Sequence, residues 1–297
     1  ADLQEYDRSL VELDDATMLI TMQEAYTPSF SDEDNPGNEY RCFSIAHNQE
    51  EPFYITELHP IVDNAALVHH IVLAKGTEAG ILPGSDAPEG VDCIRDGAFV
   101  SGDYQESGML SGWAPGMSPI RFPDGAGLRV DPDEYIVIQM HYYQSTEAGE
   151  GATDQSGYSF KTTTERPEQV VQMIPIGMQD FVIPAEEESY TMSEEFTIPL
   201  DLKLWGVFPH MHVLGSGYSM SVDNQCIIES DRYDFENQMT YMYEEPILIP
   251  ANSPINFSCT WNNSISNPDL IHNPPIETNY GERTDEEMCY MFSLISL

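Results

Sequence analysis

Five of the eight histidines lie in three short groups whose spacing suits metal binding. His69 and His70 are adjacent, His141 stands alone in an apolar run, and His210 and His212 are separated by one residue. Imidazole is the commonest metal ligand in proteins. A lone histidine on a strand is more often a hydrogen-bonded residue than a ligand, so the three groups carry weight together.

Alternation along each segment predicts where these rings point. Successive side chains of a strand leave opposite faces, so His141 lies on the opposite face from the apolar residues Ile136, Ile138, Met140 and Tyr142. His210 and His212 share one face, as two ligands of one metal should. Adjacent histidines cannot both leave a regular strand in one direction, so His69 and His70 require a bulge or ligation through different ring nitrogens. The five imidazoles are one ligand short of two three-coordinate sites, and a methionine would complete the mixed nitrogen and sulfur set that copper favours.

The elements that must position these groups are predicted to be β-strands. Short runs rich in Val, Ile, Tyr, Phe and Thr alternate with clusters of Pro, Gly, Asn and Asp; examples are 53–58, 68–74, 135–143, 158–163, 202–214 and 255–261. Strands at this spacing without intervening helices predict an all-β chain of antiparallel, jelly-roll-like β-sandwiches. We place a domain boundary near residue 166, giving an N-terminal domain of 1–166 and a C-terminal domain of 167–297.

Composition excludes several classes of partner. The 297 residues contain 51 Asp and Glu against 11 Lys and Arg, a net charge of −40. Such a chain repels nucleic-acid phosphates and anionic lipid, and it contains no apolar run long enough to span a membrane. The first residue is Ala1, so we expect a mature chain whose export signal has been removed. The expectation is a secreted, periplasmic or extracellular protein in saline surroundings; the oligomeric state stays open.

Several short strings, in order along the chain, resemble one known family. They are 40–44 (YRCFS), 68–71 (VHHI), 112–116 (GWAPG), 139–142 (QMHY), 210–212 (HMH) and 287–289 (EMC). Together they resemble the copper type II, ascorbate-dependent monooxygenases, which include peptidylglycine α-hydroxylating monooxygenase and dopamine β-monooxygenase. The resemblance runs from about residue 40 to the C-terminus.

The resemblance implies two copper sites and a fold. It makes His69, His70 and His141 the ligands of an electron-transfer copper in the N-terminal domain. It makes His210, His212 and Met288 the ligands, and hence the catalytic residues, of an oxygen-binding copper in the C-terminal domain. Gln139 and Tyr40 match positions that support the ligands. The family fold is two antiparallel β-sandwiches that face each other across a solvent-filled cleft.

The resemblance also pairs the cysteines. Cys42 with Cys93, and Cys259 with Cys289, match family disulfides, and the second would hold the residue next to Met288. Cys226 has no partner and is expected to be a buried or half-buried thiol. Gln155 stands where a further family cysteine would be.

The implied reaction inserts one oxygen atom of O2 into an unactivated C–H bond of a small-molecule substrate. The implied cofactors are two copper ions, with ascorbate as electron donor and O2 as co-substrate. A soft thioether favours Cu(I) at the second site.

The expected substrate pocket departs from the peptide-amidating branch of the family. That branch carries an Arg where this chain has Phe208, and Asn and Tyr where it has Tyr290 and Phe292. These aromatic residues predict an apolar pocket, with Glu286 on the same strand face to pair an amine. A small aromatic or amine substrate is therefore favoured, against the alternative that the aromatic side chains only pack a domain wall. The other functions weighed are a peptidylglycine-type hydroxylase and a copper carrier without turnover.

Overall fold

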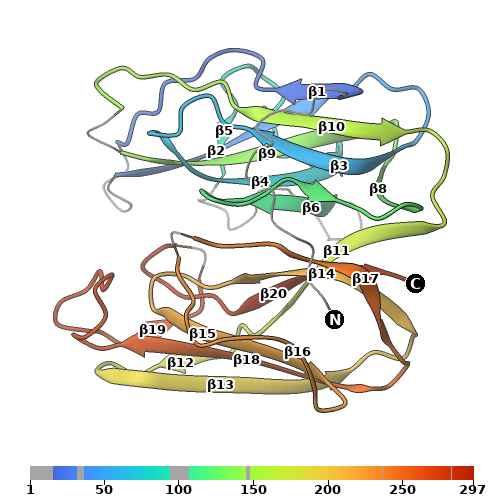
Figure 1. The fold of residues 1–297 in the computed structure, drawn as a ribbon. Coiled ribbons are helices and arrows are strands. Elements are labelled where there is room, and N and C mark those ends of the chain that lie inside the picture. Colours follow the sequence, from blue (N-terminus) through green and yellow to red (C-terminus); the bar gives the residue numbers. More distant parts are fainter. Residues whose placement is uncertain (1–15, 32–36, 94–106, 145–147, 236, 282) are drawn as a thin grey trace. The chain divides into compact units, whose positions relative to one another are not determined.

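A computed structural model describes residues 16–31, 37–93, 107–144, 148–235, 237–281 and 283–297 (Figure 1). These residues form strands, turns and loops without a helix, which confirms the all-β prediction. The described residues therefore contain no helix that is long and apolar enough to cross a membrane. The chain divides into a first compact unit that ends at Met173 and a second that runs from Ile174 to Leu297; the sequence placed this boundary at 166.

The first unit contains two sheets, drawn as separate layers in Figure 1. One has the order β5-β2-β9-β4-β6, and the other has the order β1-β10-β3-β8-β11 with β7 beside β3. The strands are β1 (Met18–Thr21), β2 (Asn38–Ala46), β3 (Phe53–Ile61), β4 (Val68–Thr77), β5 (Val91–Asp92), β6 (Ser107–Trp113), β7 (Ile120–Arg121), β8 (Ala126–Val130), β9 (Glu134–Tyr143), β10 (Gly157–Thr163) and β11 (Gln169–Gly177).

Strand β9 is the centre of the five-stranded sheet, between β2 and β4. Its predicted apolar face is fully buried, with Ile136, Ile138 and Met140 each 0% exposed. The opposite face is partly buried, because Val137 packs in a small cluster with Ala74 and Ile81 whereas Tyr143 is 52% exposed. Partial cover of this second face weakens the clean alternation of burial that a half-exposed strand shows.

The second unit also has a layered arrangement of sheets. Its four-stranded sheet has the order β13-β18-β15-β16, a second sheet continues from β11 through β20 and β14 to β17, and β12 pairs with β19. The strands are β12 (Val182–Ile183), β13 (Glu187–Thr197), β14 (Leu202–His210), β15 (Gly215–Val222), β16 (Gln225–Ser230), β17 (Tyr241–Ile249), β18 (Pro254–Asn263), β19 (Thr278–Asn279) and β20 (Tyr290–Ser296).

The core of the second unit follows from alternation in β18 and β14. Burial alternates strictly along β18, whose inward residues include Phe257, Cys259 and Trp261. Along β14 the register against β20 shifts between Leu204 and Gly206. This bulge brings Leu204 and Val207, three positions apart, into one core cluster with the β18 residues.

Candidate metal centres

The first histidine group comes together on neighbouring strands β4 and β9. His70 pairs directly with His141, and the register of β4 shifts between Val68 and His70. The shift confirms the irregularity predicted for adjacent histidines. Because the backbone is displaced at His69, both adjacent rings can turn toward His141.

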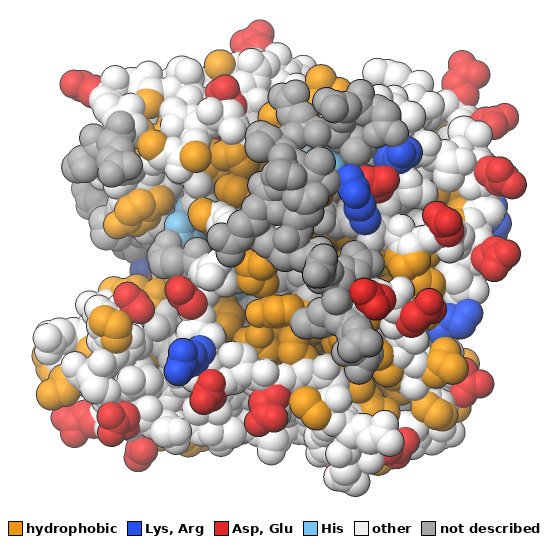
Figure 2. All heavy atoms as spheres, in the orientation of Figure 1, with side chains coloured by type: hydrophobic (Ala, Val, Ile, Leu, Met, Phe, Trp, Pro, Cys, Tyr) orange, Lys and Arg blue, Asp and Glu red, His pale blue; other side chains and the backbone are white. Residues whose placement is uncertain are grey.

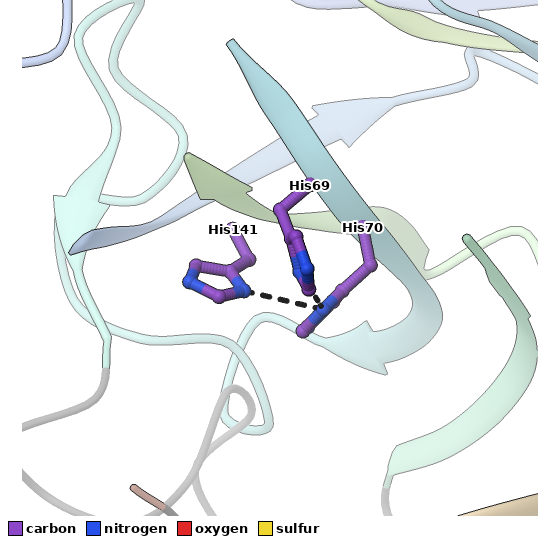
Figure 3. Close-up of side chains that lie close together, drawn as sticks. All are labelled: His69, His70 and His141. Atoms are coloured by element: carbon purple, nitrogen blue, oxygen red, sulfur yellow. Dashed lines mark hydrogen bonds between the residues drawn. The ribbon is translucent and has the colours of Figure 1, made fainter. Parts of the chain in front are cut away.

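The ring nitrogens in this group are spaced as ligands of one ion. The Nδ1 atom of His70 lies 3.2 Å from Nδ1 of His141 and 3.3 Å from Nδ1 of His69 (Figure 3). One ligand atom from each residue falls within 4.8 Å of the others. Two nitrogen atoms that are each about 2 Å from a metal ion are separated by roughly 3 to 3.5 Å. The three imidazoles therefore fit a single metal ion.

Two residues of β2 orient His141. The Nε2 atom of His141 lies 2.8 Å from Oδ1 of Asn38, so it donates its proton there and leaves Nδ1 with a free lone pair. The ring of Tyr40 stacks on the His141 ring at 4.1 Å between centroids and 8° between planes. Tyr40 thus contacts a candidate ligand directly, and its supporting role stays a prediction. Gln139 does not share that position: its Nε2 lies 3.7 Å from Sγ of Cys93.

These contacts leave His141 only 1% exposed. The parity argument placed its ring on the correct face of β9 but did not foresee that β2 would cover it. The sequence interpretation missed Asn38. Asn38 lies two residues before Tyr40, and this spacing places both side chains on the same face of β2, which could have identified Asn38 as a neighbour of His141.

The second group is built at the end of β14. His210 is the last residue of the strand, His212 follows it, and their ring centroids lie 5.2 Å apart with the planes at 82°. Nδ1 of His210 lies 2.7 Å from Oε1 of Gln238, and Nδ1 of His212 lies 3.0 Å from the carbonyl oxygen of Glu286. Gln238 donates its own Nε2 to the carbonyl of Phe235, which fixes its amide orientation. Both Nδ1 atoms therefore carry protons, and the Nε2 lone pairs are left for a ligand.

Burial keeps these two imidazoles neutral. It lowers the pKa of His210, although the hydrogen bond that His210 donates to Gln238 acts in the opposite direction. It lowers the pKa of His212 to about 3, with the nearby His210 adding to the effect. A neutral imidazole is the form that binds metal.

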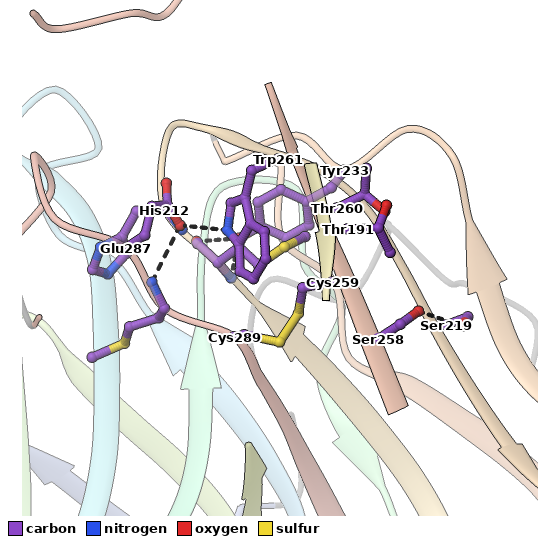
Figure 4. Close-up of a disulfide and its surroundings, with 12 residues drawn as sticks. Thr191, His212, Ser219, Tyr233, Ser258, Cys259, Thr260, Trp261, Glu287 and Cys289 are labelled. Atoms are coloured by element: carbon purple, nitrogen blue, oxygen red, sulfur yellow. Dashed lines mark hydrogen bonds between the residues drawn. A yellow bond between two sulfur atoms is a disulfide. The ribbon is translucent and has the colours of Figure 1, made fainter. Parts of the chain in front are cut away.

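Met288 is tied to this group through Glu287. The backbone N–H of Met288 and that of His212 donate to the same oxygen, Oε2 of Glu287, at 3.2 and 3.0 Å. The side chain of Met288 is 6% exposed, and the disulfide between Cys259 and Cys289 holds the next residue (Figure 4). The chain segments that carry the thioether and the two imidazoles are thus fixed to one carboxylate.

Aromatic residues continue from His210 along β14 and β20. Phe208 pairs with Phe292 and His210 pairs with Tyr290 across these strands. The Phe292 ring lies 5.9 Å from Phe208, 5.5 Å from Tyr290 and 6.1 Å from His210, measured between centroids. The hydroxyl of Tyr290 accepts a hydrogen bond from Nε2 of Gln179. We call Phe208, Phe292 and Tyr290 the aromatic stripe.

Glu286 does not join the aromatic stripe as predicted. Strand β20 begins only at Tyr290, and Glu286 lies in a preceding turn, so strand parity does not apply to it. Its carboxylate accepts the backbone N–H of Arg283 at 3.1 Å. The contribution of Glu286 to the second centre is its backbone carbonyl, which accepts from His212.

The cysteines pair as the family resemblance implied. Disulfides join Cys42 with Cys93 and Cys259 with Cys289. Cys226 is exposed, so the expectation of a buried thiol is wrong; it lies beside the turn at Asp223, where β16 is open to solvent. Gln155 donates its side-chain amide to the carbonyl oxygen of Met22 at 3.0 Å.

Comparison with known proteins agrees with the chemistry of these ligands. Residues 25–149, which hold the first histidine group, match the family "Copper type II ascorbate-dependent monooxygenase, N-terminal domain". A curated relative, peptidyl-glycine alpha-amidating monooxygenase A of Xenopus laevis, is 26% identical over 178 residues. That match covers 59% of this chain and 17% of the relative, so the chain corresponds to a small part of that protein.

Solved structures resemble the chain only weakly. Naturally occurring empty particles of cowpea mosaic virus match at a TM-score of 0.31 and 9% identity, covering 99% of this chain and 95% of theirs. The VP2 subviral particle of infectious bursal disease virus matches at 0.22 and 11%, covering 98% and 74%. These scores are too low to bear on fold or function. The family match and the three converging imidazoles agree with each other: residues 25–149 are similar to the N-terminal domain of the copper type II, ascorbate-dependent monooxygenases, and they carry a histidine group that fits one metal ion.

Proposed function

We propose that the chain is a dicopper monooxygenase that hydroxylates an unactivated C–H bond of a small aromatic or amine substrate. The observation that carries the proposal is the pair of dissimilar ligand sets. One brings together three Nδ1 atoms in the first unit, and the other offers two Nε2 atoms and a buried methionine whose backbone N–H shares an oxygen of Glu287 with that of His212. A carrier protein has no need of two sites with different donor chemistry.

The two sets suit different tasks. His69, His70 and His141 would hold a copper in an all-nitrogen site suited to electron transfer. His210, His212 and Met288 would hold a second copper, and the soft thioether favours its reduced state. When bound, copper would supply the redox chemistry that activates O2, with ascorbate as the source of electrons. The chain itself contributes neutral imidazoles, fixed tautomers and a rigid backbone around them.

The aromatic stripe supports the choice of substrate. It extends directly from His210 and consists of the buried ring of Phe208 and the half-buried rings of Phe292 and Tyr290. The residue that would clamp a peptide carboxylate, by resemblance to the peptide-amidating branch, is replaced by Phe208. An apolar aromatic lining favours a flat, uncharged ring over a terminal carboxylate.

Two disulfides support function in an oxidising compartment, and a secreted location is part of the proposal. The charge balance argues against nucleic acid as a partner.

The decisive test measures copper stoichiometry together with ascorbate-dependent O2 uptake. The purified chain should bind two copper ions and consume O2 in proportion to hydroxylated product with one or more phenethylamines. A glycine-extended peptide should be turned over more slowly. Faster turnover of the peptide would favour a peptidylglycine-type hydroxylase, which is the activity named for the Xenopus relative. Two bound coppers with no uptake for any substrate would favour a carrier.

Replacement of Met288 tests the assignment of the second site. The Met288→Ala variant should lose hydroxylation because the thioether is gone, yet it should still bind copper through the three imidazoles of the first unit. Hydroxylation at the wild-type rate in this variant would show that Met288 is not a ligand.

A further inference from the structure

Glu287 is a buried carboxylate whose contacts are all with neutral N–H donors. It is 0% exposed and lies beside the core residues Trp261, Cys259 and Cys289 (Figure 4). Burying a carboxylate away from water is costly unless its oxygens accept several hydrogen bonds. Placement of a carboxylate in an otherwise apolar core therefore calls for a specific role.

The hydrogen bonds of Glu287 converge from three separate parts of the chain. Its Oε2 accepts from the backbone N–H of His212 at 3.0 Å, from that of Met288 at 3.2 Å and from Nε1 of Trp261 at 3.1 Å. Its Oε1 accepts from the backbone N–H of Leu214 at 2.7 Å. His212 and Leu214 follow the end of β14, Met288 precedes β20, and Trp261 belongs to β18.

Oε2 of Glu287 links the His212 segment to the Met288 segment, and no described strand pairing connects these two residues. The register between β14 and β20 ends at the pair His210 and Tyr290, so His212 and Met288 lie just beyond it. Their N–H groups would otherwise need separate partners in a buried region. A single oxygen atom that accepts from both sets the distance between the two backbones directly.

We propose that Glu287 is a positioning residue for the second metal centre, holding the His212 and Met288 segments at the separation that lets imidazole and thioether meet one copper ion. The inference rests on the proposed function, because it takes His210, His212 and Met288 as ligands. Glu287 itself does not touch the metal in this arrangement, since both its oxygens accept from the protein.

The length of the side chain, more than its charge, is what the role requires. Glu287→Gln keeps the length and one oxygen, which can still accept from His212, Met288 and Trp261. Its amide nitrogen cannot accept from Leu214, so that one hydrogen bond is lost while the link between His212 and Met288 is kept. Glu287→Asp keeps the charge and both acceptors but shortens the side chain by one methylene. Glu287→Leu removes the acceptors, and Trp261→Phe removes one donor without disturbing the link between His212 and Met288.

The experiment measures copper at the second centre separately from folding. Each variant is loaded with copper, and X-ray absorption at the copper edge records the sulfur ligand. That signal arises only from the second centre, because the first offers three imidazoles. Copper affinity is measured by competition with a chelator, and the free energy of unfolding is measured by urea denaturation. Retention of the first copper shows that the first unit is folded, and a cooperative urea transition of the metal-free chain, followed by the fluorescence of Trp205 and Trp261, shows that the second unit is folded.

In the expected result, Glu287→Gln and Trp261→Phe keep the sulfur signal and bind the second copper within a fewfold of wild type. Glu287→Asp and Glu287→Leu lose the sulfur signal and bind it about 10- to 100-fold more weakly, the usual effect of losing a residue that supports a ligand. If Glu287→Leu does not fold, the contrast between the Gln and Asp variants decides the matter.

Two outcomes would overturn the proposal, and they differ. In the first, Glu287→Asp keeps the sulfur signal and the wild-type copper affinity, and any folded Glu287→Leu keeps the sulfur signal. That outcome would remove the positioning role and leave the proposed function intact. Absence of a second, sulfur-ligated copper in the wild-type chain would remove the proposed second site and the inference with it.

Discussion

Three of the five imidazoles in the two candidate centres have a hydrogen-bond acceptor that decides which ring nitrogen can bind a metal ion. Asn38 accepts from Nε2 of His141, whereas Gln238 accepts from Nδ1 of His210 and the Glu286 carbonyl accepts from Nδ1 of His212. The first centre therefore offers Nδ1 and the second offers Nε2. The acceptors are buried or half-buried, so water does not easily replace them.

At this scale the Asn38→Leu variant is informative. Loss of the acceptor leaves the Nε2 proton of His141 without a fixed partner, so copper at the first centre should bind about 10- to 100-fold more weakly. The measurement is a chelator competition on a Met288→Ala background, which isolates the first centre. Asn38→Asp retains an acceptor oxygen and serves as the matched control. Equal affinities for the Leu and Asp variants would contradict the prediction.

Asp154 gives a prediction about pH. Burial raises its pKa above the ordinary value of 3.8, and this outweighs the hydrogen bonds from Ser156, Asn64 and Tyr142. A raised folded-state pKa means that the folded chain holds a proton the unfolded chain has released, so this contribution to stability falls as pH rises from 3.8 through the folded pKa. The difference in unfolding free energy between wild type and Asp154→Asn should therefore become less favourable to wild type as the pH rises from 3.8 to 7. A difference that moves the other way in urea denaturation of the metal-free chain would show a lowered pKa.

Among the elements, the end of β14 and the start of β20 matter most, because the candidate ligands of the second centre lie at or just after the end of β14 and just before β20 begins. The disulfide between Cys259 and Cys289 anchors β18 to the residue after Met288 and closes a sequence separation of 30 residues. A closed loop of that length stabilises the folded state by about 3–4 kcal/mol in the chain-entropy treatment.

In the double variant Cys259→Ser, Cys289→Ser the free energy of unfolding should fall by about 3–4 kcal/mol, and the affinity of the second centre for copper should fall as well. Urea denaturation and copper titration measure the two effects. Cys226→Ser is the matched control, because this cysteine is exposed and unpaired, and it should leave both quantities unchanged. A double variant that binds the second copper as wild type does would show that Met288 is held without the disulfide.

For the whole molecule, the dominant feature is the excess of acidic side chains. Figure 2 shows Asp and Glu spread over the visible face with few Lys and Arg among them. With 51 acidic against 11 basic residues, most carboxylates cannot have a cationic partner. Among the described residues, Glu57 forms ion pairs with two of these basic residues, Arg121 and Lys161. Mutual repulsion among the remaining carboxylates opposes the compact state.

Added salt should therefore stabilise this chain. Screening shortens the reach of repulsion from about 30 Å at 0.01 M salt to about 3 Å at 1 M. The midpoint of thermal unfolding should rise by several degrees between these concentrations of KCl, and sucrose at matched osmolality should not reproduce the dependence on ionic strength. A midpoint that falls with KCl would mean that ion pairs such as that of Lys75 with Glu134 outweigh the repulsion.

A large part of the fold and of the first centre could be predicted from sequence, because strand periodicity is a local property. Alternation identified the buried face of β9, and the adjacency of His69 and His70 predicted either a bulge or ligation through different ring nitrogens, of which β4 shows the bulge. Parity failed at Glu286 because the chain there is a turn. Exposure of Cys226 could not be foreseen, since it depends on what packs over β16.

Sequence by itself identified the candidate ligands, the all-β architecture and, through family resemblance, the pairing of the cysteines. Tertiary structure alone decided which nitrogen His141, His210 and His212 present, and it brought Asn38 to His141 and Glu287 to His212. The physical reason is distance along the chain: Asn38 is 103 residues from His141, and Glu287 is 75 residues from His212. Periodicity sets the side of a strand on which a residue lies, whereas packing between strands decides what that residue meets there.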